Sequence, residues 1–373
     1  MTAVSQVSSS AGTLRHFAET MAVGAAGGAL FDLARFPAGW MAGSLLCVAV
    51  AALAGRPTHV PTTVSRVFFV CLGMIIGAVA TPETVRGMAT WPASIAIIAV
   101  AMIAVTLAAA AYLRLVHGWD AQTALFASVP GALSQVSIIA AEREADLRAI
   151  VVVQTVRVII LAVGVPLGLT VLGLHAATTL PTSRVGALDA PLDFALLVIP
   201  SIAAAISLYR LGFSGGFFFG PMIVSAFLHG AGMIELSLPG WLAILAMIGL
   251  GAINGSRFNQ TSFRMLGHYL AASLGSLLVV VAVAAAFVVA AEALLHLPMQ
   301  SLVASYAPGS VDVMMILALA LHLDPVFVGA HHLARIIVVS IALPIGAHLT
   351  DRRPTRHHDL PEPLETARET LED

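Results

Sequence analysis

The 373-residue chain contains no lysine, and charged residues make up only 10% of it, whereas apolar residues make up 59%. A water-soluble domain needs far more charge to cover its surface, so this composition predicts an integral membrane protein. The two cysteines, Cys47 and Cys71, are too few for a disulfide or metal framework, and both fall in apolar stretches where small core residues are expected. The Gly-rich Lys-Ser/Thr motif that cradles ATP phosphates is absent too, so energy for any transport would come from an ion gradient or from the solute's own gradient.

Long apolar runs recur along the chain at the length of a membrane-spanning helix, which needs roughly 20 mostly apolar residues. Gly and Pro interrupt these runs and no alternation of period two appears, which favours helices over a membrane barrel. Each half also holds one weaker, broken apolar segment, at 121–142 and at 299–321. The expected spans lie near residues 17–34, 38–54, 64–82, 91–113, 147–172, 192–209, 215–233, 240–256, 268–293 and 325–349.

The two halves of the chain resemble each other. The segment Pro130–Gly168 recurs 178 positions later as Pro308–Gly346, and one of the identical pairs is Arg157/Arg335. Further matches on both sides keep the same order of elements, as in a membrane transporter built from two repeats. The expected organisation is an N-terminal tail (1–16), a first membrane repeat (17–175), a polar linker (176–191), a second membrane repeat (192–350) and a disordered cytoplasmic tail (351–373).

The arginines outside the spans indicate how the repeats are oriented. If each broken segment is re-entrant, each half crosses the membrane five times, the second half is inverted and both termini share a side. Twelve arginines then fall on that side and three on the other, which is the usual bias of cytoplasmic loops. If the broken segments cross fully, the bias disappears. We therefore expect an all-α membrane protein with an inverted 5+5 arrangement and both ends in the cytoplasm. The twelve are Arg15, Arg56, Arg66, Arg114, Arg143, Arg148, Arg210, Arg257, Arg264, Arg352, Arg353 and Arg356, against Arg35, Arg86 and Arg184.

The broken segments are the first candidate site. Proline blocks helix continuation and glycine accepts unusual dihedrals, so a helix interrupted there exposes free N–H groups at the start of a half-helix, and these favour anions. The simpler alternative is a proline kink in an ordinary span. The polar and breaking positions at the two sites are Pro130, Gly131 and Ser134 in the first half, and Pro308, Gly309 and Ser310 in the second.

Arg157 and Arg335 are the second candidate site, because each lies about ten residues into an apolar helix. An arginine at mid-bilayer costs roughly 3 to well over 10 kcal/mol, so it needs a partner or a cavity. Gln154 and His332 precede them by three residues and share their helix faces. In an inverted pair the two guanidinium groups would converge near the midplane and bind a carboxylate or another oxyanion. The alternative is a structural arginine that clamps the carbonyls of the broken helix or pairs with Asp312.

Several other residues have alternative interpretations. Asp312 is a candidate for ion coupling, through a proton or sodium, or it neutralises Arg335. Asp146 and Asp324 open the two arginine helices and are expected to cap them. Gly39/Gly43 and Gly216/Gly220 have the spacing of close helix packing or of a backbone approach to a cavity. His331 and His332 are neighbours on a helix and point about 100° apart, so no metal site is expected there.

The segments Trp40-Met-Ala-Gly43 and Phe219-Gly220-Pro221-Met222, with the paired Pro-Gly…Arg…Pro blocks, resemble the AbrB-type bacterial membrane protein family with an internal duplication. The resemblance covers about residues 20–348. It implies a membrane location and an indirect influence on gene expression, since members are often labelled ammonia monooxygenases or transcriptional regulators. The residues support neither label literally. Clustered metal ligands for an oxygenase are absent, and so is the basic surface that nucleic acid requires.

We therefore expect a secondary transporter of the cytoplasmic membrane that moves a small, anionic solute by alternating access. It would have no catalytic residue, cofactor or metal, and its partners would be the solute, membrane lipid and a second copy of the chain as a homodimer, but not nucleic acid. The alternative is a membrane sensor that influences gene expression through another protein.

Overall fold

The structure is a computed structural model that describes residues 2–80, 89, 91–130, 136, 140, 145–173, 185–186, 190–213 and 215–350, with the side chains of residues 2–11 left out. The described chain is helical throughout, apart from a parallel pairing of two two-residue strands, β1 (Val185–Gly186) and β2 (Leu236–Ser237). The fold class predicted from the sequence, all-α, is confirmed.

The helices of the two halves follow one another in the same order. In the first half they are α1 (Thr2–Leu33), α2 (Gly39–Leu53), α3 (Thr62–Gly77), α5 (Trp91–His117), α6 (Ala121–Ser128) and α8 (Leu147–Val171). In the second half they are α9 (Pro191–Arg210), α10 (Gly216–Gly230), α11 (Gly240–Gly255), the 3-10 helix η2 (Ser256–Gln260), α12 (Phe263–Leu295), α13 (Met299–Tyr306), α14 (Val311–Ala320) and α15 (Pro325–Leu349).

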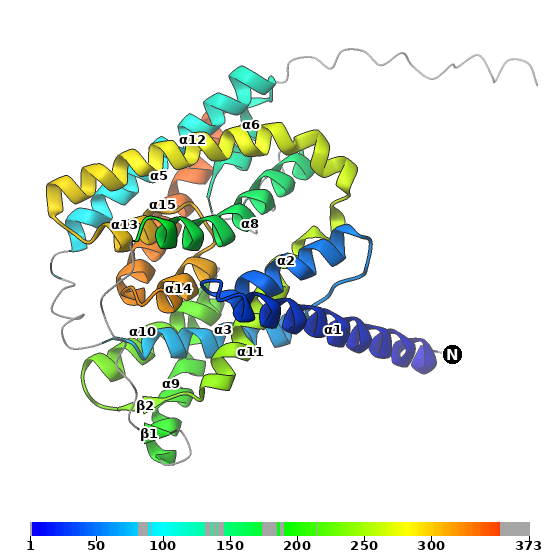
Figure 1. The fold of residues 1–373 in the computed structure, drawn as a ribbon, viewed down its shortest axis with the longest axis vertical. Helices are drawn as coiled ribbons and strands as arrows, with labels where there is room; N and C mark the ends of the chain where they lie inside the picture. Colours follow the sequence, from blue (N-terminus) through cyan, green and yellow to red (C-terminus); the bar gives the residue numbers. More distant parts are fainter. Residues whose placement is uncertain are drawn as a thin grey trace, which may run out of the picture.

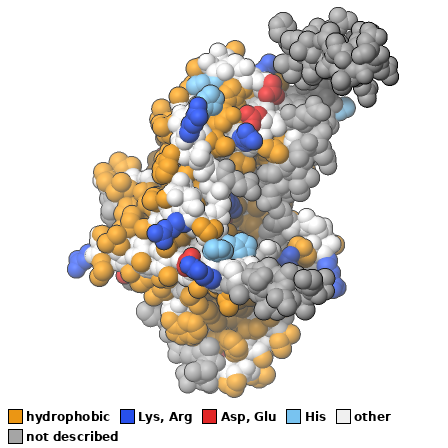
Figure 2. All heavy atoms as spheres, turned by 90° about the vertical axis from the view of Figure 1, so that its right-hand side faces the viewer, with side chains coloured by type: hydrophobic (Ala, Val, Ile, Leu, Met, Phe, Trp, Pro, Cys, Tyr) orange, Lys and Arg blue, Asp and Glu red, His pale blue; other side chains and the backbone are white. Residues whose placement is uncertain are grey.

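Within the described residues, six helical segments are long and apolar enough to cross a membrane: Trp91–His117, Leu147–Leu169, Pro191–Arg210, Gly240–Asn259, Phe263–Leu295 and Pro325–Leu343. Large apolar side chains such as Leu107, Leu278 and Ile341 are 60%, 70% and 61% exposed. Figure 2 shows such side chains over much of one face, with few charged groups among them. The chain is thus an all-α membrane protein. The span expected at 17–34 overlaps α1, which begins at Thr2 and is not among the six, because polar residues that include Glu19 and Asp32 interrupt its apolar residues. The spans expected at 38–54, 64–82 and 215–233 correspond to the shorter apolar helices α2, α3 and α10.

Helices of both halves pack together in a first bundle, which we call the flanking bundle. In it α1 packs on α2, α2 on α11, α11 on α3, α3 on α10, and α10 on α9. The contact of α2 with α11 is thus matched by that of α10 with α3, with the halves exchanged. These helices occupy the lower part of Figure 1, where α1 runs out from the bundle to the N-terminus.

The remaining helices form a second bundle, which we call the clamp bundle. The long helices α5 and α12 pack on each other, α6 lies against α5 and α8, and α13 lies against α12 and α15. Here too each contact in one half has its counterpart in the other. The bundles meet where α14 and α15 touch α3, where α14 touches α11 and where α8 touches α2. In Figure 1 the clamp bundle is uppermost and α14 lies towards the flanking bundle.

Glycines let the flanking helices approach closely, as their spacing predicts. A Cβ atom added to Gly43 would collide with the backbone of Gly27 in α1, and one at Gly220 with the backbone of Ala204 and Ala205 in α9. The contact between the halves uses the same device, because a Cβ atom at Gly251 would lie 2.6 Å from the carbonyl oxygen of Met41. Backbone cannot move aside as a flexible side chain can, so these positions require glycine.

Replacing Gly251 with Ala should therefore push α2 and α11 apart and lower the free energy of unfolding by about 1–3 kcal/mol. The matched control is Gly267→Ala on an exposed face of α12, where nothing lies within 4 Å of the added Cβ. That change should be neutral or stabilising by up to about 1 kcal/mol. Thermal unfolding in detergent measures both, and equal melting temperatures for the two variants would contradict the packing argument.

Candidate functional site

Both broken segments are interrupted at the proline that the sequence singles out. Helix α6 ends at Ser128, and Val129, just before Pro130, has extended backbone angles. Helix α13 ends at Tyr306, and Ala307, just before Pro308, is extended in the same way. The residue before a proline avoids helical angles, which explains the shared geometry.

The interruptions leave helices too short to cross the membrane alone. The eight residues of α13 and the ten of α14 extend over roughly 12 and 15 Å, about half the hydrocarbon thickness. The second broken segment is therefore not one continuous helix through the bilayer, since α14 starts only at Val311, just past the interruption. Of the first segment's predicted site residues, Pro130 is buried, whereas Gly131 and Ser134 lie outside the described residues.

The two buried arginines bind carbonyl groups at the ends of α6 and α13. The guanidinium of Arg157 donates from Nη2 to the carbonyl of Ala127 at 2.9 Å and from Nη1 to that of Ser128 at 3.2 Å. The guanidinium of Arg335 donates to the carbonyls of Ala307 at 2.9 Å and Gly309 at 2.8 Å. A helix leaves its last carbonyls without partners and carries partial negative charge there, so a guanidinium fork satisfies both needs. The clamping role considered for the arginines is confirmed.

Gln154 and His332 extend each clamp by one further hydrogen bond. Nε2 of Gln154 donates to the carbonyl of Phe126 at 2.9 Å, and Nε2 of His332 donates to that of Ala304 at 3.2 Å. The two donors are 178 positions apart, as are the two acceptors, so the bond is duplicated although Gln replaces His. Since a carbonyl only accepts, the proton of neutral His332 lies on Nε2, and its buried Nδ1 has no partner.

The two guanidinium groups are buried within electrostatic range of each other. Arg157 is 2% exposed and Arg335 is 0% exposed, and they lie near enough for their positive charges to repel each other. Nε of each arginine is buried without a hydrogen-bond partner. In the part of the chain that the structure describes, neither arginine forms an ion pair with a carboxylate. The clamp bundle therefore holds two like charges, one from each half, that only carbonyl dipoles compensate.

Asp312 does not neutralise Arg335, so that alternative is wrong. Its carboxylate accepts hydrogen bonds from the Ser310 hydroxyl and, at 3.3 Å, from Nδ2 of Asn254 in α11, and its charge acts on Arg257 in η2. The reason is geometric: Asp312 lies in the first turn of α14, which contacts α11, whereas Arg335 donates to carbonyl groups within the interruption that precedes α14. Asp312 thus sits where the two bundles touch.

Ser310 precedes α14 but does not cap it, because its hydroxyl is engaged with the Asp312 side chain. The first N–H groups of α14 therefore have no side-chain partner within the described structure. Sequence reasoning missed Asn254, which is 2% exposed and whose Oδ1 has no partner. The available signal was a single amide side chain within the apolar run of α11.

The arginine helices begin as predicted. Asp146 accepts hydrogen bonds from the backbone N–H groups of Arg148 and Ala149, and Asp324 accepts them from Val326 and Phe327, at 2.9–3.1 Å. These caps fix where α8 and α15 start, and hence the depth at which each arginine meets its short helix.

Two further features bear on ligand binding, a cavity and the grouping of metal-ligating side chains. A cavity of about 220 Å³ lies between α5, α6 and α15, lined by apolar residues that include Leu107, Val129 and Leu343 but neither arginine. Among the described residues, no group of three His, Cys, Asp or Glu side chains could hold a metal ion.

The replacement Gln154→Met should leave the carbonyl of Phe126 buried without a donor and reduce the free energy of unfolding by about 1–3 kcal/mol. The control is Gln122→Met, which makes the same chemical change at a half-buried position on α6 and should change the free energy by less than about 0.5 kcal/mol. Thermal melts of the two purified variants decide the matter. A Gln154 variant as stable as its control would mean that the bond to α6 contributes nothing.

Comparison with known proteins assigns the chain to a family. The family model described as "Transition state regulatory protein AbrB" matches residues 40–351. An "Uncharacterized protein YhjN" from Bacillus subtilis (strain 168) is 23% identical over 347 residues, which cover 87% of this chain and 90% of that protein. No solved structure matches the chain significantly. Because the family model covers most of its length, the chain belongs to the AbrB family of that description.

Proposed function

We propose that the protein is a secondary transporter of the cytoplasmic membrane that carries a small anionic solute by alternating access between its two bundles. The observation that carries the proposal is the burial of Arg157 and Arg335 within electrostatic range of each other. Their charges repel, and neither has a carboxylate partner in the described chain. Clustered positive charge of this kind favours the binding of an anion.

Burial of the two guanidinium charges is unfavourable unless other groups offset it. A guanidinium in the membrane interior costs several kcal/mol, and the carbonyl ends of α6 and α13 offset only part of this cost. Each arginine uses its two terminal nitrogens for the clamp, which leaves the buried Nε–H group as a free donor. One negative charge shared between the two groups would relieve their repulsion and satisfy these donors. The uncapped start of α14 adds further N–H groups to the same half of the site.

The arrangement of the bundles supports a moving part. The clamps lie within the clamp bundle, whereas Asp312 and Asn254 bring the two bundles together. An ion bound at Asp312 would therefore act on the contact that has to change in alternating access. We assign no catalytic residues to the site and propose no enzymatic activity. We also propose that both termini lie in the cytoplasm, which the arginine distribution favours if the broken segments are re-entrant.

A screen of small anions by thermal shift in detergent tests solute binding. A ligand that binds the folded protein raises its free energy of unfolding, by about 2.7 kcal/mol when the ligand concentration is one hundred times the Kd. Carboxylates, phosphate and sulfate should include a stabilising compound, and their uncharged analogues should not. Arg157→Lys and Arg335→Lys keep the charge but lose the fork, and each should weaken binding of that compound at least tenfold (about 1.4 kcal/mol). Arg66→Gln, which changes a guanidinium that contacts Tyr209 outside the clamp bundle, should leave binding unchanged.

Uptake of the same compound into proteoliposomes separates transport from sensing. A transporter accumulates the compound inside the vesicles, whereas a sensor binds it without flux. Stabilisation by uncharged compounds alone would overturn the anionic assignment, and binding without uptake would favour the sensor.

Asp312→Asn should abolish uptake driven by an ion gradient while solute binding persists, since the amide keeps the shape of the carboxylate but can neither carry a proton nor offset a cation. Asp193→Asn in the first turn of α9, outside the clamp bundle, is the control and should retain uptake. Gradient-driven accumulation that survives in the Asp312 variant would remove this residue from the coupling mechanism.

A further inference from the structure

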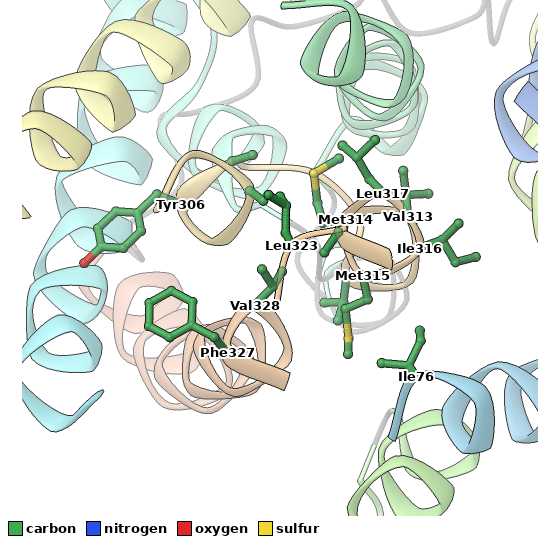
Figure 3. Close-up of a cluster of buried hydrophobic side chains, with 14 of the residues drawn as sticks. Ile76, Tyr306, Val313, Met314, Met315, Ile316, Leu317, Leu323, Phe327 and Val328 are labelled. Carbon is green, nitrogen blue, oxygen red and sulfur yellow. The ribbon is translucent and has the colours of Figure 1, made fainter. Parts of the chain in front are cut away.

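A buried polar network joins α5 of the first half to α13 and α15 of the second. His331, one residue before the clamp residue His332, hydrogen-bonds to Ser94 of α5, and the hydroxyl of Tyr306 donates to the backbone carbonyl of Ser94 at 2.8 Å. All three side chains are completely buried. Figure 3 shows Tyr306 and Phe327 beside each other at the edge of the core cluster, and the ring of Phe327 packs against His331 with centroids 4.1 Å apart.

The hydrogen atoms in this network can be counted. Nδ1 of His331 lies 2.8 Å from the carbonyl oxygen of Phe327, which only accepts, so Nδ1 carries a proton. Nε2 lies 2.7 Å from the Ser94 hydroxyl oxygen, and that oxygen lies 2.9 Å from the carbonyl oxygen of Trp91. Ser94 has one hydrogen to give and two acceptors within reach.

The acceptor to which the Ser94 hydroxyl donates determines the charge of His331. If the hydroxyl donates to Nε2, His331 is neutral. If it donates to the carbonyl of Trp91, Nε2 must itself donate to the Ser94 oxygen, and His331 is a cation. Rotation of one hydroxyl thus allows the imidazole to gain or lose a proton while every polar atom of the ring stays hydrogen-bonded. Burial without such a partner would strongly disfavour the cation.

We propose that His331 and Ser94 form a proton-binding site in the core of the protein, in which the Ser94 hydroxyl switches acceptors as His331 changes charge. The site is distinct from Asp312, and it lies at the contact of α5 in the first half with α15 in the second. Nothing in the first half duplicates it, since the position equivalent to His331 is Val153.

The surrounding charges determine what else protonation responds to. On α15 itself, His332 follows His331 directly and points about 100° away from it, and Arg335 follows one helical turn later. Asp324 caps the start of the same helix, two turns before His331. The Tyr306 ring lies 6.3 Å away. The other ionisable groups of the elements packed on α15 are Asp312 on α14, Arg66 and Cys71 on α3, Asp120 at the start of α6, and Tyr112, Arg114 and His117 near the far end of α5.

The proton site does not rest on the proposed function.

The test uses Trp91 as a local probe, because its ring lies 5.6 Å from that of Phe327 and its carbonyl belongs to the network. In a background with Trp40, Trp119 and Trp241 changed to Phe, emission is titrated between about pH 5 and pH 8, without any solute. A cationic imidazole quenches tryptophan, so emission should fall reversibly on acidification. Ser94→Ala removes the acceptor of the charged ring and should shift the midpoint to lower pH by about one unit.

His331→Gln should abolish the titration, and the control His348→Gln, at the exposed end of the same helix, should leave it unchanged. If the His331 variant does not fold, the parent protein, Ser94→Ala and His348→Gln still decide. Emission that stays flat, or a midpoint that Ser94→Ala does not move, would overturn the proton site and leave anion transport untouched. Conversely, a titration of the expected form stands even if no anion is transported.

Discussion

The structure depends on one interaction made twice, a guanidinium that closes the carbonyl end of a short, interrupted helix. Without it, α6 and α13 would end inside the protein with unsatisfied carbonyl groups, which is untenable at membrane depth. Arg157 and Arg335 supply the donors, Gln154 and His332 each add one more, and aspartate caps set the start of the helices that carry them. A proline break can persist in a membrane core only with such support.

The same interaction underlies our proposal that the site binds an anion. Satisfying carbonyl groups would need only neutral donors, and Gln154 shows that an amide can do it. The chain instead buries two full positive charges, brings them within range of each other and leaves Nε of each unpaired. That excess of charge is costly as architecture but useful for recognition. The energetic cost of burying two positive charges is consistent with a site that binds a negatively charged ligand.

Much of the clamp could be predicted from the sequence, because duplication shows which residues act in equivalent places. The pairing of Arg157 with Arg335, the breaks before Pro130 and Pro308, and the caps at Asp146 and Asp324 all follow from local pattern. Contacts between distant segments could not be predicted this way. Asp312 meets Asn254 because α14 happens to face α11, and Ser94 meets His331 across 237 positions. The residues of neither pair recur at the equivalent positions of the other half of the sequence, so the repeat gave no guide to these contacts. The inverted 5+5 arrangement stays a prediction.

The central claim is that Arg157 and Arg335 share an anion while each holds its short helix. A cryo-EM map of the protein in lipid nanodiscs, with a stabilising anion and at a resolution that shows side chains, tests this most directly. The account predicts density for the anion between the two guanidinium groups, with both sets of carbonyl hydrogen bonds intact. Guanidinium groups that point apart, or that are each paired with a carboxylate of the protein, would contradict it.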